Sequence, residues 1–259
     1  MAVTSAREQF DRQAAHYDNR WANWSEAPLK QMLVWADPQP QWRVLDNDTV
    51  TGYTALAFAP HVAHVTGADI SPNMLAQAAR HAQEQGIANV AWHEAAAESL
   101  PFDNEAFDLV TVRIAPHHFA DVRAFLSETR RVLRPNGVFV LGDTTVPGDE
   151  PAAAEWQNAV ERLRDTSHAA NLPARVWREM TEEAGLRISH VETQAGEIKL
   201  TLSAWLAVAG CDGDRARQVR QMFTHAPDDA RRAFHITTDA AGETYFAWQR
   251  VLLKAHRPA

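Results

Sequence analysis

Strands and helices alternate along the first 150 residues, and this alternation constrains the fold more than any other feature of the sequence. Apolar runs of these lengths predict a doubly wound α/β sheet, mostly parallel, with helices on both faces. Ser71 before Pro72 is a helix-start signal, and the stretch 134–137 predicts a stop followed by a turn. We expect strands at 43–46, 64–68, 89–94, 108–112 and 137–143, and helices at 53–59, 72–85 and 121–133.

The segment 44–52 joins the first of these strands to the next helix. A strand, a tight loop and a helix in this order are typical of nucleotide-binding sites, where glycines allow unusual φ values and a close approach to the ligand. Of the three glycines of a D-x-G-x-G-x-G loop beginning at Asp46, only Gly52 is present, and Asp48 and Val50 replace the others. The same residues therefore predict a cofactor fold and a weakened cofactor loop.

The remaining segments extend this core at both ends. Amphipathic helices are expected at 5–17 and 27–35, and a turn-rich break at 147–151 precedes helices at 152–165 and 174–184, a strand at 187–193, helical stretches within 202–223 and a last strand at 245–254. We expect a seven-stranded, Rossmann-like sheet with an N-terminal helical lid at 1–40, a cofactor-binding core at 41–150 and a C-terminal part at 151–259. The C-terminal part includes a helical cap before the last strand. It carries large side chains that could line a pocket but are more often core residues: Trp177, Trp205, Met222 and Phe223.

Composition narrows the partners of the protein. The net charge of −8 argues against nucleic acid or an anionic membrane as the main partner. Cys211 is the single cysteine, which excludes an intramolecular disulfide and fits a reducing compartment. The first ten residues lack an apolar signal core, and no apolar run approaches the length of a membrane span. We expect a cytoplasmic protein that acts on a small molecule; a homodimer through an exposed final strand is also possible.

Six segments in register resemble class I S-adenosylmethionine-dependent methyltransferases, especially the ubiquinone/menaquinone-biosynthesis C-methyltransferases and their small-molecule relatives. They are 10–18, 65–75, 97–102, 107–110, 117–119 and 131–137. The resemblance spans roughly residues 10–150 and implies S-adenosylmethionine as cofactor and methyl transfer to a small, partly apolar molecule. It speaks more directly to the fold than to the activity, because function belongs to the site.

The resemblance also implies which residues hold the adenosine part of the cofactor. Asp69, at the end of the second strand, would accept hydrogen bonds from both ribose hydroxyls, as a carboxylate can. Ile70 and Met74 would line the adenine, or else pack only in the core. The backbone N–H of Ala97 would reach the adenine ring, while Ala96 replaces the usual acidic residue at a cost of about 1.5–3 kcal/mol unless Glu94 or Glu98 compensates.

In the glycine loop, the resemblance assigns Asp46, Asp48, Val50 and Gly52 to cofactor binding. A β-branched side chain at Val50 should clash or push the loop outward, and a positive φ there would cost about 1–3 kcal/mol. Asp48 would repel the carboxylate of the cofactor but could pair with its ammonium or sulfonium group. We expect weaker binding of S-adenosylmethionine than in a glycine-complete relative; the alternative is a shifted loop and normal methylation.

Candidates for chemistry follow the fourth strand, at the edge of the sheet where ligands bind in open α/β folds. Either His117 or His118 could be a general base, with the other buried in a structural role. Arg113 could hold an anionic substrate or form a salt bridge to a nearby carboxylate, that of Asp143 or Asp46. Tyr17, in the N-terminal helix, resembles part of a lid over the cofactor.

A second hypothesis belongs to another class of function. Several carboxylates and imidazoles could converge at one sheet edge: Asp46, Asp48, Asp69, Asp143, His117 and His118. Such a set could bind a divalent metal or support hydrolase, lyase or isomerase chemistry without a methyl donor. The sequence has no H-E-x-x-H or C-x-x-C motif, so we expect no metal. A non-catalytic ligand-binding descendant is a third reading.

Overall fold

The computed structural model describes residues 7, 10–11, 20–194 and 200–259, with only the backbone of 20–25. Its main sheet has the order β3-β2-β1-β4-β5-β10-β6. The first five strands are parallel, and β10 is antiparallel to both its neighbours. The strands are β1 (Arg43–Asn47), β2 (His64–Asp69), β3 (Val90–Glu94), β4 (Phe107–Arg113), β5 (Leu133–Thr145), β6 (Arg187–Gln194) and β10 (Gln249–His256). The predicted mostly parallel, seven-stranded Rossmann-like sheet is confirmed.

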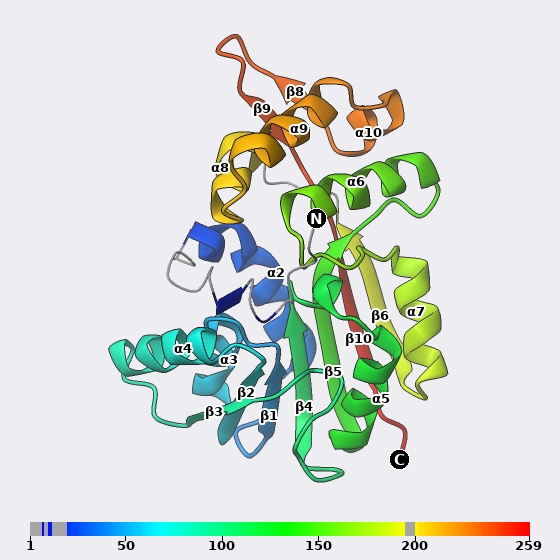
Figure 1. Cartoon of the computed structure of the whole chain (residues 1–259). Helices are drawn as coiled ribbons and strands as arrows, with labels where there is room; N and C mark the ends of the chain where they lie inside the picture. Colours follow the sequence, from blue (N-terminus) through cyan, green and yellow to red (C-terminus); the bar gives the residue numbers. More distant parts are fainter. Residues whose placement is uncertain (1–6, 8–9, 12–19, 195–199) are drawn as a thin grey trace.

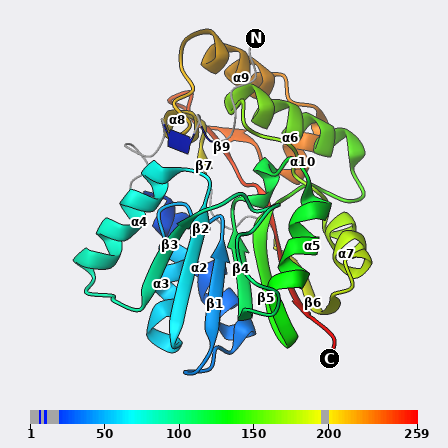
Figure 2. The ribbon, with the colours of Figure 1, turned by 60° about the horizontal axis from the view of Figure 1, so that its bottom comes forward.

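Helices cover both faces of this sheet (Figure 2). On one face α2 (Arg20–Ala36) and α3 (Tyr53–Phe58) share a buried apolar cluster with β1, β4 and β5. On the other face α5 (Val122–Val132) and α7 (Ala174–Glu183) pack around the fully buried ring of Trp177. Helix α4 (Pro72–Glu84) contacts β2 and β3, and begins at Ser71, whose side chain accepts a hydrogen bond from the N–H of Met74. Short 3-10 turns follow α3 at Ala59–His61 and β4 at Pro116–His118.

A cap lies beyond the carboxyl ends of the parallel strands (Figure 1). It consists of α6 (Pro151–Arg164), α8 (Leu202–Val208), α9 (Gly213–Thr224), α10 (Asp228–Ala233) and a small antiparallel sheet with the order β7-β9-β8. The strands of that sheet are β7 (Leu200–Thr201), β8 (Thr237–Thr238) and β9 (Thr244–Phe246). The cap has its own buried aromatic cluster: Trp156, Trp205, Phe223, Phe234, Phe246 and Trp248. Aromatic packing therefore holds together elements that come from distant parts of the sequence.

The structure corrects three expectations about element boundaries. The predicted strand 245–254 is two strands, because the chain passes from the cap sheet at β9 into the main sheet at β10. Residues 134–137 are an irregular stretch inside β5, where Asn136 has φ 65° and its N–H donates to the carbonyl of Arg257. Helix α2 is longer than the predicted 27–35 because it continues through Pro28, a residue more usual in a first turn. The predicted helix 5–17 falls largely outside the described residues.

The last strand is not an edge strand, which removes the basis for the expected dimer. Strand β10 lies between β5 and β6 and pairs along its length with both. Its run Val251, Leu252 and Leu253 is completely buried, as expected for a strand covered on both faces. Within the described residues, no helix is both long enough and apolar enough to cross a membrane.

Close packing between neighbouring strands makes Gly67 on β2 a sensitive position. A Cβ there would lie 2.5 Å from Cζ3 of Trp92 on β3, which is closer than side chains tolerate. We expect Gly67→Ala to lower the free energy of unfolding by about 1–3 kcal/mol, measured by urea denaturation. Combining it with Trp92→Leu should remove most of that penalty; simple additivity of the two costs would contradict the proposed clash.

Candidate functional site

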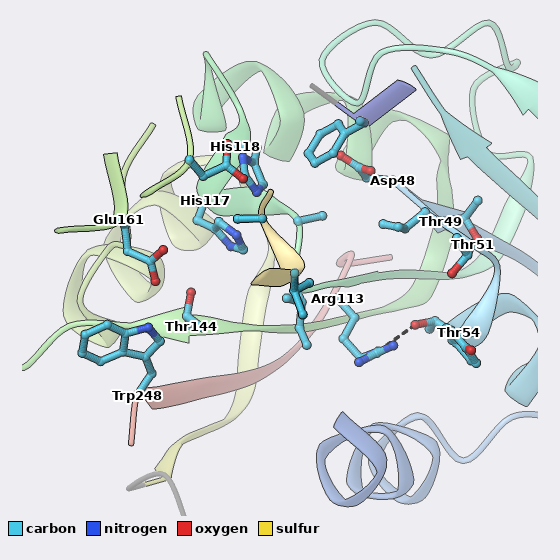
Figure 3. A pocket seen from close by; sticks show the side chains of 18 of the residues that line it. Asp48, Thr49, Thr51, Thr54, Arg113, His117, His118, Thr144, Glu161 and Trp248 are labelled. Atoms are coloured by element: carbon cyan, nitrogen blue, oxygen red, sulfur yellow. Dashed lines mark hydrogen bonds between the residues drawn. The ribbon is translucent and has the colours of Figure 1, made fainter. Parts of the chain in front are cut away.

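A cavity lies between the cap and the carboxyl ends of β1, β4 and β5. Figure 3 shows two facing sides. One side comes from the loop after β1 and the start of α3, and includes Asp48 and Thr54. The other comes from the turn after β4 and from the cap, and includes His117 and Glu161. Ligands bind at this edge in open α/β folds, so the cavity is the leading candidate for the functional site.

Three residues of the cavity wall have a strained backbone conformation. Asp48, Val50 and Ile114 all line the cavity and have φ values of 59°, 52° and 54°. Non-glycine residues rarely adopt this region, and each costs about 1–3 kcal/mol. The structure thus gives the loop a glycine-like conformation without the glycines. Of the three glycine positions in the loop, only position 52 holds a glycine, with φ 87°. A Cβ at Gly52 would lie 2.9 Å from Cβ of Ala78, so a larger residue would clash there.

Asp46 holds the loop in this conformation from beneath. Its buried carboxylate accepts hydrogen bonds from the hydroxyl of Thr49 at 2.6 Å, the N–H of Ala55 at 3.1 Å and the hydroxyl of Thr111 at 2.8 Å. These bonds tie β1 to its loop, to α3 and to β4. Burial raises the pKa of Asp46 to about 6, although the hydrogen bonds and the charge of Arg113 oppose the shift.

Asp69 closes the loop from the neighbouring strand. Its carboxylate accepts hydrogen bonds from the backbone N–H groups of Val50 and Ser71, both at 2.8 Å. Burial and then the negative charge of Asp69 raise the pKa of Asp48 well above its usual range. Burial also raises the pKa of Asp69, although its interactions with Asp48 and with the two backbone N–H groups oppose the shift, so both carboxyl groups are weaker acids than usual.

The expected adenine side is apolar and occupied by the chain itself. Phe10 and Met74 are buried together, with Val50 and Ile70 packed against them. The segment that carries Phe10 is held in place next to α4, because the hydroxyl of Ser71 donates a hydrogen bond to Oδ1 of Asp11 at 2.6 Å. Tyr17 lies outside the described residues, so its expected role as part of a lid stays a prediction.

These residues match S-adenosylmethionine in kind, because a carboxylate ends β2 and apolar side chains follow it. The cavity volume is about 90 Å³, whereas pockets for small molecules usually enclose roughly 300–1,000 Å³. Asp69 is also outside the cavity lining, behind Asp48 and Val50. Binding of the cofactor therefore requires Phe10 or the strained loop to move.

His117 and Asp143 form a carboxylate–imidazole pair on the opposite side. Nδ1 of His117 lies 2.6 Å from Oδ1 of Asp143, a buried carboxylate at the end of β5. Burial lowers the pKa of His117, but the charge and hydrogen bond of Asp143 outweigh this effect and raise it overall. Since Nδ1 carries the proton shared with Asp143, Nε2 is the atom that can take a proton from another molecule.

His118 has a different environment although it is adjacent in sequence. Its Nδ1 lies 3.0 Å from the hydroxyl oxygen of Ser167, in the loop that follows α6. Burial and the nearby charge of His117 lower the pKa of His118 to about 3. The two rings, 4.3 Å apart between centroids, thus have opposite pKa shifts. His168, whose pKa is also lowered by burial, lies against both.

Charged side chains of the cap line the far end of the cavity. The guanidinium of Arg164 lies 4.3 Å from the ring centre of Trp205 and donates to its carbonyl oxygen. It also contacts Oε2 of Glu161 at 3.3 Å, while burial raises the pKa of Glu161. Nearer the sheet, Nε of Arg113 donates a hydrogen bond to the hydroxyl of Thr54 at 2.9 Å. The expected partner was instead the carboxylate of Asp143 or Asp46.

The structure divides the residues predicted for the site. It brings five of them into the cavity lining: Asp48, Val50, Arg113, His117 and His118. It leaves seven outside that lining: Asp46, Gly52, Asp69, Ile70, Met74, Ala96 and Ala97. Glu94 pairs with Arg7, and Glu98 accepts from the N–H groups of Ala120 and Asp121, so both carboxylates have other partners. Among the described residues, no group of three or more His, Cys, Asp or Glu side chains could hold a metal ion.

Sequence reasoning missed the contributions of the cap. The sequence predicts Glu161, Arg164 and Asp165 only as part of the helix 152–165 and Trp248 only as part of the strand 245–254, and it assigns no role to Ser167. A signal was present, because Glu161 and Arg164 fall on the same face of α6 as the buried apolar residues Ala153 and Val160. Charged residues on an apolar helix face are unusual and indicate a buried polar site.

Comparisons with known proteins agree with this architecture. Residues 45–141 match the family model described as a methyltransferase domain. The chain is 35% identical over 234 residues to the uncharacterized methyltransferase YcgJ of Bacillus subtilis, which covers 90% of this chain and 91% of that protein. The crystal structure of YcgJ has a TM-score of 0.85, at 34% identity, and covers 90% of this chain and 99% of that chain.

A more distant relative points to the same branch. The ubiquinone/menaquinone biosynthesis C-methyltransferase UbiE of Brucella anthropi is 35% identical over 150 residues, 54% of this chain and 56% of that protein. These findings do not favour the hydrolase, lyase or isomerase alternative. S-adenosylmethionine is the cofactor to which this family points. The chain belongs to the class I S-adenosylmethionine-dependent methyltransferases, in the group related to UbiE.

Proposed function

We propose that the protein transfers a methyl group from S-adenosylmethionine to a small, partly apolar molecule held between the sheet and the cap. One observation carries this proposal. A single cavity joins the loop after β1, where the family binds its cofactor, to an imidazole base and the aromatic rings of Trp205 and Trp248. Once Phe10 or the loop moves to admit the cofactor, a methyl donor and an acceptor would meet at this one place, which is the main requirement for methyl transfer.

On the cofactor side, the protein supplies positioning. When bound, the cofactor supplies an electrophilic methyl group on a sulfonium. Asp69 would accept hydrogen bonds from the ribose hydroxyls once Asp48 is displaced, and Ile70 and Met74 would flank the adenine. Ionised Asp48 would then be a carboxylate available to the positive groups of the cofactor.

On the acceptor side, the protein supplies a base. His117 is oriented by Asp143 through Nδ1, so that Nε2 can accept the proton of a hydroxyl, thiol or acidic carbon as the methyl group is transferred. Asp143 also stabilises the imidazolium that results, because the two groups are buried together. Because residues of the cap line the cavity, they limit the access of water to this reaction.

Calorimetric titration with S-adenosylmethionine and S-adenosylhomocysteine tests the proposal directly. We expect both to bind, with affinities in the micromolar range, or about −8 kcal/mol. The protein should first be denatured and its supernatant checked for cofactor carried through purification. Absence of binding by ligand-free protein at about millimolar concentrations, roughly −4 kcal/mol, would overturn the proposal.

Restoring glycines to the loop should strengthen cofactor binding. The double variant Asp48→Gly, Val50→Gly removes two strained φ values and opens the path to Asp69. We expect its affinity for S-adenosylmethionine to rise about tenfold or more, equivalent to about 1.4 kcal/mol. His235→Gly is the matched control, because His235 also has a positive φ, 48°, but is exposed and outside the cavity lining. Unchanged affinity in the double variant, or an equal gain in the control, would contradict this interpretation.

The pKa of His117 should depend on Asp143. Because the charge and hydrogen bond of Asp143 stabilise the imidazolium, Asp143→Asn should lower the pKa of His117. The fraction of neutral, base-competent His117 would then rise at lower pH than in the parent protein. NMR titration of the histidine ring signals measures this without a substrate, and exposed His225 in the same spectrum is the internal control. An unchanged His117 titration would show that Asp143 does not tune the base.

A further inference from the structure

The loop after α6 forms a hydrogen-bond chain that ends at His118. The N–H and the hydroxyl of Ser167 both donate to Oδ1 of Asp165, at 2.9 Å and 2.6 Å. The oxygen of the same hydroxyl lies 3.0 Å from Nδ1 of His118. The chain Asp165–Ser167–His118 therefore links the cap to the turn after β4, beside the cavity.

The order of donors in this chain determines the tautomer of His118. A hydroxyl has one proton, and Ser167 donates it to a carboxylate, the stronger acceptor. At the contact with His118 the oxygen of Ser167 must then accept, so Nδ1 of His118 carries a hydrogen. In a neutral imidazole the other nitrogen, Nε2, has no hydrogen and is an acceptor.

The surroundings keep the ring neutral as well as oriented. His118 is enclosed by Phe10, whose ring meets it edge-on at 4.9 Å, and by His117 and His168. Burial and then the charge of His117 disfavour a positive charge on His118 and outweigh the opposing charge of Asp165, so the pKa of His118 is lowered. In the described part of the chain, the ring forms its hydrogen bond through Nδ1, which leaves Nε2 for a molecule in the cavity.

We infer that Ser167 is a positioning residue that holds His118 as a neutral hydrogen-bond acceptor beside the base His117, and that the methyl acceptor carries a hydroxyl which donates to His118. The role of Ser167 and His118 does not depend on the proposed function. The identification of the bound molecule as the methyl acceptor rests on it. The two histidines then have separate roles. His117 takes a proton during the reaction, whereas His118 selects molecules with an O–H group close to the position that is methylated.

The tautomer can be observed without cofactor or substrate, so its test is independent of methyl transfer. In protein labelled with ¹⁵N-histidine, long-range ¹H–¹⁵N spectra distinguish a protonated from an unprotonated ring nitrogen, and His118→Gln assigns the signal. We expect hydrogen on Nδ1 and none on Nε2, unchanged from about pH 5 to about pH 9, where an ordinary histidine would titrate. Hydrogen on Nε2 in the parent protein would overturn the inference.

Variants of Ser167 separate positioning from simple packing. Ser167→Ala should give a mixture of the two tautomers, and Ser167→Thr, which retains the hydroxyl, should restore the single one. Thermal unfolding of both variants checks that the fold is retained. A single unchanged tautomer in Ser167→Ala would show that the hydroxyl does not select it, and would also overturn the inference.

Phenol and anisole test the selected chemistry, because they share a ring and differ in the O–H. We expect phenol to shift the Nε2 signal of His118 and anisole to leave it in place. Ser167→Ala should weaken phenol binding by roughly three- to tenfold, the effect of one hydrogen bond. Equal shifts with both molecules would refute selection for a hydroxyl. Failure to bind S-adenosylmethionine would instead overturn the proposed function and leave the tautomer result standing.

Discussion

The buried carboxylate of Asp46 is the interaction on which the rest of the site depends. It accepts hydrogen bonds from Thr49, Ala55 and Thr111, and so joins the loop to the helix that follows it and to β4. These bonds help to offset the strained φ values at Asp48 and Val50. With the loop held in this orientation, the backbone N–H of Val50 donates a hydrogen bond to the carboxylate of Asp69. One ionisable group at the end of a strand thus organises two neighbouring strands and the cavity between the sheet and the cap.

The site consists of two acid–base pairs with opposite tasks. On one side of the cavity, burial and the charge of Asp69 raise the pKa of Asp48 in a region where a cofactor would need a free carboxylate. On the other side, Asp143 raises the pKa of His117, where a base is needed. Burial drives the first shift and an opposite charge drives the second. Ile114, just after β4, has a strained φ of 54°, and the hydrogen bond from its N–H to the carbonyl of Gly142 helps to hold that conformation.

Much of the fold could be predicted from the sequence, and less of the site. Apolar runs of strand length, punctuated by residues such as Pro72, predict the parallel sheet because local periodicity reports burial directly. The sequence also allowed His117 to be predicted as a site residue, and Asp48 and Val50 to be recognised where the loop lacks its glycines. The contribution of Ser167 was not, because its meaning depends on a contact with His118, 49 residues away along the chain. The roles assigned to the cofactor-binding residues, and the division into 1–40, 41–150 and 151–259, stay predictions.

The sequence by itself determined the sheet, the order of its first elements and the chemistry available at the ends of its strands. It did so because the residues that follow a strand in the sequence must also follow it in space, at the end of that strand. Only the tertiary structure decided that β10 enters between β5 and β6, that the cap brings Glu161 and Arg164 to the cavity, and that His117 and His118 have opposite pKa shifts. These outcomes depend on burial and on charges from distant segments. Hydrogen bonds and desolvation depend on which segments meet in space, and the residues adjacent in sequence do not predict those contacts.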